Sequence, residues 1–122
     1  MLEKRRFHRV RFKSACEMIH NTISYRGQLE NISLNGALVS FSDGVIVPQD
    51  DECLLKLYLE GERGDLQMTV KVIYANFTMV GVKFSSMDGG SRERLIRLVA
   101  ALSDDPAKVA QEQKLLESEE LM

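Results

Sequence analysis

The strongest constraint on the fold is the two-residue alternation of side chains in residues 66–75, "LQMTVKVIYA". A period of two is typical of a β-strand, because successive side chains point to opposite faces of a sheet. The segment therefore predicts a strand. Its two faces would carry Leu66, Met68, Val70, Val72 and Tyr74 on one side, and Gln67, Thr69, Lys71 and Ile73 on the other.

Five further segments are short, rich in apolar residues and separated by turn signals, as strands of a small β protein are. We expect one turn near Tyr25–Gly27 and a long turn over residues 42–52, where Gly, Pro and Asp are frequent. The six expected strands are residues 15–20, 27–32, 36–41, 53–60, 66–75 and 78–84.

The period changes in residues 91–102, "SRERLIRLVAAL". Leu95, Leu98, Val99 and Leu102 follow the i, i+3, i+4, i+7 spacing of an amphipathic helix, and we expect Ser91 to cap it. Six antiparallel strands and one terminal helix do not suit a wound α/β sheet. A mainly β fold, a six-stranded antiparallel β-barrel with a C-terminal α-helix, buries every apolar face and is our prediction.

The chain of 122 residues, 44% of them hydrophobic, is long enough for one domain. We expect residues 1–13 to form a basic N-terminal arm, 14–103 the barrel and helix, and 104–122 an acidic tail with a short helix around 106–117. The first twenty residues contain no apolar run of the kind found in signal peptides or membrane spans. We therefore expect a cytoplasmic protein without membrane insertion.

Positive charge is concentrated in the arm. Residues Glu3–Lys13, "EKRRFHRVRFK", contain six basic residues and one acid, which gives +5 in a chain whose net charge is -2. The rest of the chain carries -7. Such asymmetry indicates either a local anionic partner or an arm that pairs with the protein's own acids.

Little in the sequence suggests catalysis or metal binding. Cys16 and Cys53 have no CxxC partner, and with only His8 and His20 they make no zinc spacing, so both thiols are expected in the core. The acidic run 50–52 is interpreted as a solvated turn. Because no nucleophile–base pair or phosphate-binding glycine loop is found, we expect neither an enzyme nor a resident metal or cofactor.

Two short motifs lie about twenty residues apart in the sequence. The arm contains R-x-x-x-R, and the second expected strand ends in N-x-S-x-x-G. Guanidinium groups pair with phosphates and with guanine edges, while amide, hydroxyl and a bare glycine backbone offer further polar contacts. The residues concerned are Arg5 and Arg9 with Arg6 between them, and Asn31, Ser33 and Gly36.

In these motifs the sequence resembles the PilZ-domain family, whose receptors bind the bacterial second messenger cyclic di-GMP through an R-x-x-x-R arm and a D/N-x-S-x-x-G strand end. Gly27, four residues before Asn31, and "GVKF" at 81–84 also match, so the resemblance covers about residues 5–102. It implies a cyclic di-GMP receptor that orders its arm on binding and signals to a downstream protein. The implied ligand contacts are Arg5, Arg6, Arg9, Asn31, Ser33, Gly36 and, as an aromatic residue near a guanine, Tyr74.

Each implied contact has a structural alternative. Asn31 and Ser33 can close a turn through bonds to the backbone, Gly36 can be a bulge glycine or adopt a positive φ, and Tyr74 can pack in the core. Asn31 stands where the family more often has Asp, which removes a charge that could accept from guanine.

Two other functions are compatible with a small barrel: a nucleic-acid-binding module, and a PilZ-like adaptor that does not bind the nucleotide. Binding of single-stranded nucleic acid favours a broad basic surface with exposed aromatic residues. Residues 14–103 carry 8 basic and 11 acidic residues, and the chain has no tryptophan. We therefore expect no nucleic-acid partner.

Overall fold

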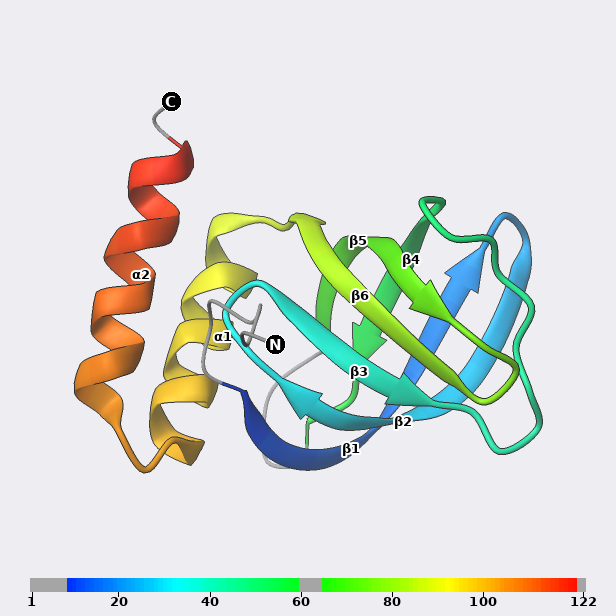
Figure 1. The fold of residues 1–122 in the computed structure, drawn as a ribbon, viewed down its shortest axis with the longest axis horizontal. Helices are drawn as coiled ribbons and strands as arrows, with labels where there is room; N and C mark the ends of the chain where they lie inside the picture. Colours follow the sequence, from blue (N-terminus) through cyan, green and yellow to red (C-terminus); the bar gives the residue numbers. More distant parts are fainter. Residues whose placement is uncertain (1–8, 60–64, 121–122) are drawn as a thin grey trace, which may run out of the picture.

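The computed structural model describes residues 9–59 and 65–120, with side chains as far as residue 115. They form a closed barrel of six antiparallel strands followed by two helices (Figure 1). The expected mainly β barrel with a C-terminal helix is confirmed. The elements are β1 (Val10–His20), β2 (Ile23–Ile32), β3 (Gly36–Ser40), β4 (Glu52–Leu57), β5 (Leu66–Ala75), β6 (Met79–Ser86), α1 (Gly89–Leu102) and α2 (Pro106–Glu120).

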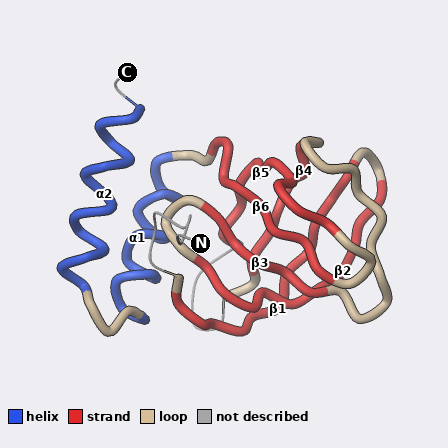
Figure 2. Tube along the Cα trace, viewed as in Figure 1, coloured by secondary structure: helices blue, strands red, loops and turns tan. Residues whose placement is uncertain are grey.

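The strands follow the order β1-β2-β3-β6-β5-β4 around the barrel, and β4 pairs with β1 to close it. Closure satisfies the backbone groups that an open sheet would leave at its edges. Helix α1 lies against one end of the barrel, and α2 packs on the side of α1 that faces away from it (Figure 2). No helix in the described ranges is both long and apolar enough to cross a membrane.

The barrel interior contains the apolar sets that alternation predicts. Leu66, Met68, Val70 and Val72 of β5 are buried, as are Cys53, Leu55 and Leu57 of β4. Both cysteines are buried free thiols, and burial raises the pKa of Cys16 to about 12. The thiol of Cys16 is therefore protonated at neutral pH and serves as a small core residue.

Gly27 makes room for the largest side chain of this core. An added Cβ would lie 2.5 Å from the Ser40 carbonyl oxygen and 2.7 Å from the Phe41 ring. Phe41 is 1% exposed, and its ring meets Tyr25 edge-on at a centroid distance of 6.3 Å. The glycine that the family resemblance singled out thus has a packing role.

Two local expectations were wrong. The turn between β1 and β2 lies at residues 21–22, where Asn21 has φ 58°, and Tyr25–Gly27 lies inside β2. Asparagine tolerates this left-handed conformation better than most residues. The cap of α1 is Asp88, whose carboxylate accepts from the Ser91 amide at 2.7 Å, so Ser91 lies inside the helix.

The structure also changes the expected ends of the domain. Residues 10–13, assigned to the arm, belong to β1, where Val10 lies opposite Ile32 of β2. In the expected tail, α2 begins at Pro106 and extends beyond the predicted residue 117. Most of its described side chains are exposed, whereas Val109 and Glu112 are buried.

Candidate functional site

Within the described residues, a side-chain hydrogen bond joins the two sequence motifs. Arg9 Nη1 donates to Asn31 Oδ1 at 3.2 Å. The pairing of β1 with β2 brings the two residues together, since Arg11 lies directly opposite Asn31. Arg5 and Arg6 lie outside the described residues. The contact places the guanidinium of Arg9 beside the end of β2, whereas a ligand contact of either residue stays a prediction.

Ser33 closes the turn between β2 and β3. Ser33 is 1% exposed, and its hydroxyl accepts from the amides of Asn35 and Gly36 at 3.3 and 3.2 Å. The same hydroxyl lies 3.0 Å from Asn35 Oδ1 and 3.3 Å from the Gly36 carbonyl oxygen, so it can donate to either. Of the two interpretations of Ser33, the structure contains the turn-closing one. A ligand contact of Ser33 stays a prediction.

Asn35, an unspecified position of the N-x-S-x-x-G motif, is a further residue of this turn. The backbone carbonyl oxygen of Asn35 accepts from the backbone amide of Phe84 at 2.8 Å. This bond connects the β2–β3 turn to β6. The available signal was the Asn-Gly dipeptide at 35–36, because Asn followed by Gly is typical of tight turns.

A close approach of β3 and β6 requires a glycine at residue 36. Among glycines in the described ranges only Gly44 has a positive φ, so the positive φ considered as one alternative for Gly36 was wrong. An added Cβ at residue 36 would lie 2.4 Å from the Val82 carbonyl oxygen of β6. The missing side chain therefore lets β3 and β6 pair at this end of the barrel.

Tyr74 lies on the outside of the barrel, on one lateral row with Asn31. The row runs from Asn31 of β2 through Leu38 of β3 and Gly81 of β6 to Tyr74 of β5, each residue opposite the next. Three strand spacings, about 14 Å along the barrel wall, separate its ends, which is half of the six-strand circuit. Tyr74 is 52% exposed, so the alternative that it packs in the core was wrong.

A β-bulge explains the direction of Tyr74. The register of β5 against β6 shifts between Val72 and Tyr74, so that Ile73 is an extra residue in β5. Both Ile73 and Tyr74 are exposed, at 47% and 52%. The alternating set predicted for β5 therefore ends at Val72, because a bulge reverses the faces of the residues beyond it.

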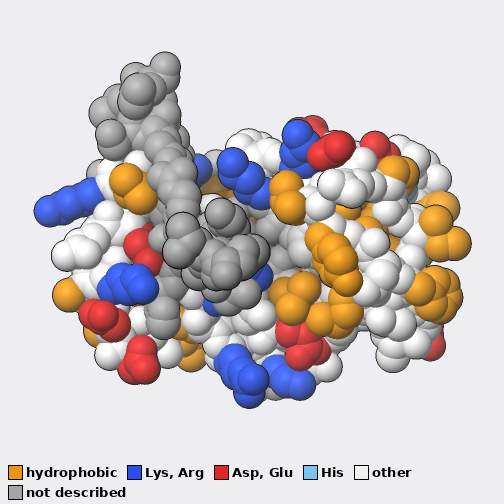
Figure 3. Space-filling model, in the orientation of Figure 1, with side chains coloured by type: hydrophobic (Ala, Val, Ile, Leu, Met, Phe, Trp, Pro, Cys, Tyr) orange, Lys and Arg blue, Asp and Glu red, His pale blue; other side chains and the backbone are white. Residues whose placement is uncertain are grey.

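The row has a low, largely apolar middle. We call Leu38 and Gly81 of the row, together with Gly36 beside them on β3, the floor. Leu38 and Gly81 are half-buried, Gly36 is buried, and the two glycines have no side chain. Figure 3 views the molecule from the side on which β3 and β6 lie in front, and hydrophobic side chains lie there in the middle of the barrel and at its right-hand end. Charged side chains lie mostly around the edges of this face.

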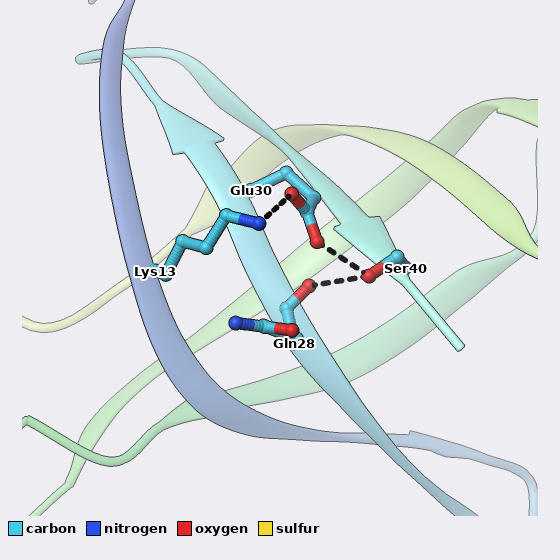
Figure 4. Close-up of polar contacts among 4 residues, drawn as sticks. All are labelled: Lys13, Gln28, Glu30 and Ser40. Carbon is cyan, nitrogen blue, oxygen red and sulfur yellow. Dashed lines mark hydrogen bonds and ion pairs between the residues drawn. The ribbon is translucent and has the colours of Figure 1, made fainter. Parts of the chain in front are cut away.

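A carboxylate connects the strands next to Asn31. Glu30 is the extra residue of a second bulge, in β2, and its carboxylate accepts from Ser40 Oγ of β3 at 2.7 Å and pairs with Lys13 Nζ of β1 at 3.3 Å (Figure 4). The Ser40 hydroxyl, with a smaller contribution from Lys13, lowers the pKa of Glu30 against the opposing effect of burial. The ionised carboxylate thus bridges three strands beside the row.

Acidic and sulfur side chains do not form a metal centre in the part of the chain that the structure describes. No three His, Cys, Asp or Glu side chains gather there in a way that could hold a metal ion. The acidic run before β4 is exposed, as predicted, and its Asp51 Oδ2 lies 2.9 Å from His20 Nε2.

Comparison with known proteins settles the family. The family model of the PilZ domain matches residues 3–101 of the chain. The chain belongs to the PilZ domain family. No curated protein matches it at the level required for significance.

Solved structures agree with this assignment of the fold. The PilZ domain of YcgR from Escherichia coli, solved with c-di-GMP, superposes with a TM-score of 0.70 at 13% identity, covering 98% of this chain and 100% of that one. The PilZ domain of CeSA from a cellulose-synthesizing bacterium superposes with a TM-score of 0.64 at 23% identity. The match covers 78% of this chain and 97% of that one.

The Bacillus subtilis inhibitor of motility MotI/DgrA gives a TM-score of 0.65 at 16% identity. The match covers 80% of this chain and 49% of that protein, so this chain spans about half of it. At these identities the three structures establish the shared PilZ fold.

We predict that Gly36→Ala destabilises the protein by about 1–3 kcal/mol, because the new methyl group meets a backbone oxygen that cannot move without disturbing the β3–β6 pairing. Denaturant unfolding measures this change. The matched control is Gly81→Ala, on the neighbouring strand of the floor, where an added Cβ would lie 3.7 Å from Tyr74 Cβ, an ordinary contact. Equal stability of the two variants would show that Gly36 is only a permissive turn residue.

Proposed function

We propose that this chain is a receptor for cyclic di-GMP, which it binds on the outer face of the barrel between the Arg9–Asn31 pair and Tyr74. The observation that carries the proposal is the hydrogen bond of 3.2 Å from Arg9 to Asn31, because it unites the two motifs at one place. Membership of the PilZ family supports the choice of ligand. The E. coli YcgR PilZ domain, which has the same fold, was solved with c-di-GMP.

The chemistry of the ligand suits the residues of the row. Cyclic di-GMP presents two phosphates and two guanines. A guanidinium can pair with a phosphate or with the O6/N7 edge of guanine through two parallel N–H groups, or lie flat on the base. The hydrogen bond to Asn31 helps to position the guanidinium of Arg9, so the ligand meets a restrained group.

The floor suits a flat base. Half-buried Leu38 and Gly81, with buried Gly36 beside them, leave a low apolar surface on which a guanine can lie without displacing a side chain. Tyr74 borders this surface and supplies an aromatic ring, and stacking of a base on such a ring contributes about 1–3 kcal/mol. The Tyr74 hydroxyl accepts from Asn76 Nδ2 at 2.6 Å, which restrains the ring.

The arm completes the site in this proposal. Arg5 and Arg6 belong to the segment Glu3–Lys13, which has a net charge of +5. A dianionic ligand neutralises part of the repulsion among these positive charges. The arm then lies across the ligand and forms, together with the barrel, a new surface that a downstream protein recognises. The chain acts as an effector in this account, with no chemical step of its own.

We predict that Arg9→Ala weakens cyclic di-GMP binding by about 2–5 kcal/mol, because a charge-assisted contact is lost and Asn31 loses its partner. Calorimetry of the wild type and the variant measures the change, with melting curves recorded alongside. Arg26→Ala is the matched control, since Arg26 is an exposed arginine of the same strand as Asn31, lying opposite Glu17 toward the other end.

Titrations with GMP and with a single-stranded oligonucleotide separate the competing functions. The proposal requires tight binding of the cyclic dinucleotide and weak binding of both controls. Absence of cyclic di-GMP binding by the wild type would favour the adaptor, and preference for the oligonucleotide would favour the nucleic-acid module.

We also predict that ligand binding protects the arm from hydrogen exchange. New amide protection in residues 3–9 and 31–36 on addition of cyclic di-GMP is the expected result, because those segments lie on either side of the ligand in the proposal. Amides of the arm that are equally protected without ligand would mean a preformed pocket, which contradicts ordering of the arm while leaving binding itself intact.

A further inference from the structure

Lys83 lies at one end of the floor and belongs to neither motif. It is exposed on β6, two residues beyond Gly81, so its side chain is on the same outer face. Its lateral neighbours are Gly36 of β3 on one side and Lys71 of β5 on the other. Lys83 is therefore next to the residue with which the N-x-S-x-x-G motif ends.

The lateral neighbours of Lys83 leave its charge without an opposite acid. Lys71 faces Lys83 on one side and Glu52 of β4 on the other. Lys83 has Lys71 on one side and, on the other, a glycine without a side chain. The ion pairs found within residues 9–59 and 65–115 do not include it. Like charges directly opposite each other in an antiparallel pair are destabilising.

This lysine pair is not part of a generally basic surface. Residues 14–103 carry an excess of acids, with 8 basic and 11 acidic residues. Two lysines placed opposite each other beside the floor, with Glu52 on the far side of Lys71 offsetting only one of them, thus leave a local positive potential at the Lys83 end on a mildly acidic barrel. An anion bound there would offset the repulsion between them.

We propose that Lys83 is a phosphate-binding residue of the barrel side of the site, with Lys71 reinforcing the positive potential. The proposal rests on the proposed cyclic di-GMP function and deepens it. The arm contributes positive charge from one side of the ligand, and Lys83 contributes it from a strand whose backbone is held by pairing with both β3 and β5. One phosphate of the dinucleotide then lies at the Lys83 end of the floor.

The test is calorimetry of Lys83→Ala with cyclic di-GMP. We expect affinity to fall about 3- to 10-fold, the range of a partly exposed ion pair, and the loss to shrink as salt is added. The melting temperature should stay unchanged or rise, because the variant removes a like-charge pair. Lys83→Arg should retain wild-type affinity, since it keeps the charge.

Lys56→Ala is the matched control, because it removes one lysine from β4, where Lys56 lies opposite Glu17 and Gln67 on another part of the barrel. Its affinity should equal that of the wild type. Equal affinity of Lys83→Ala and wild type, or a loss that Lys56→Ala shares, would overturn the role of Lys83 while the receptor function stands. A loss of affinity accompanied by lower stability would also overturn it. Failure of the wild type to bind would refute the receptor function itself.

Discussion

The close approach of β3 to β6 at Gly36 determines how the strands that carry the candidate site pair with each other. Because residue 36 has no Cβ, the Val82 carbonyl oxygen can lie where a side chain would begin, 2.4 Å from that position. The pairing that follows places Leu38 opposite Gly81 and connects β2 to β5 across four neighbouring strands. Asn31 and Tyr74, far apart in sequence, thereby come to lie on one outer row that runs half-way round the barrel.

Two bulges then decide which side chains face outward. The extra residues Glu30 in β2 and Ile73 in β5 lie next to the two ends of the row, at Asn31 and Tyr74. Each bulge turns the following residues to the other face of the sheet, and bulges are frequent beside functional sites. At the β2 bulge the Glu30 carboxylate bridges to Ser40 and Lys13, which keeps the backbone beside Asn31 in place.

Alternation in the sequence was enough to predict the strands, the interior set from Leu66 to Val72 and the antiparallel barrel, because these follow from local periodicity. It could not predict the direction of Tyr74, since a bulge depends on the register with β6. The sequence also could not predict why residue 36 is a glycine, because the carbonyl oxygen that approaches it belongs to Val82, 46 residues away. The motifs predicted that Arg9 and Asn31 belong together, whereas the roles of Ser33 and Asn35 in the turn required the backbone hydrogen bonds to be known.

The central claim is that cyclic di-GMP occupies the outer row between Asn31 and Tyr74. Titration of the 15N-labelled protein with the dinucleotide, followed by amide chemical shifts, tests it most directly because it reports where the ligand lies on every strand at once. The account predicts that the largest changes occur at Asn31, Gly36, Gly81 and Tyr74, with little change in β4. Changes concentrated in β4 and the loop before it, or no changes at saturating ligand, would contradict it.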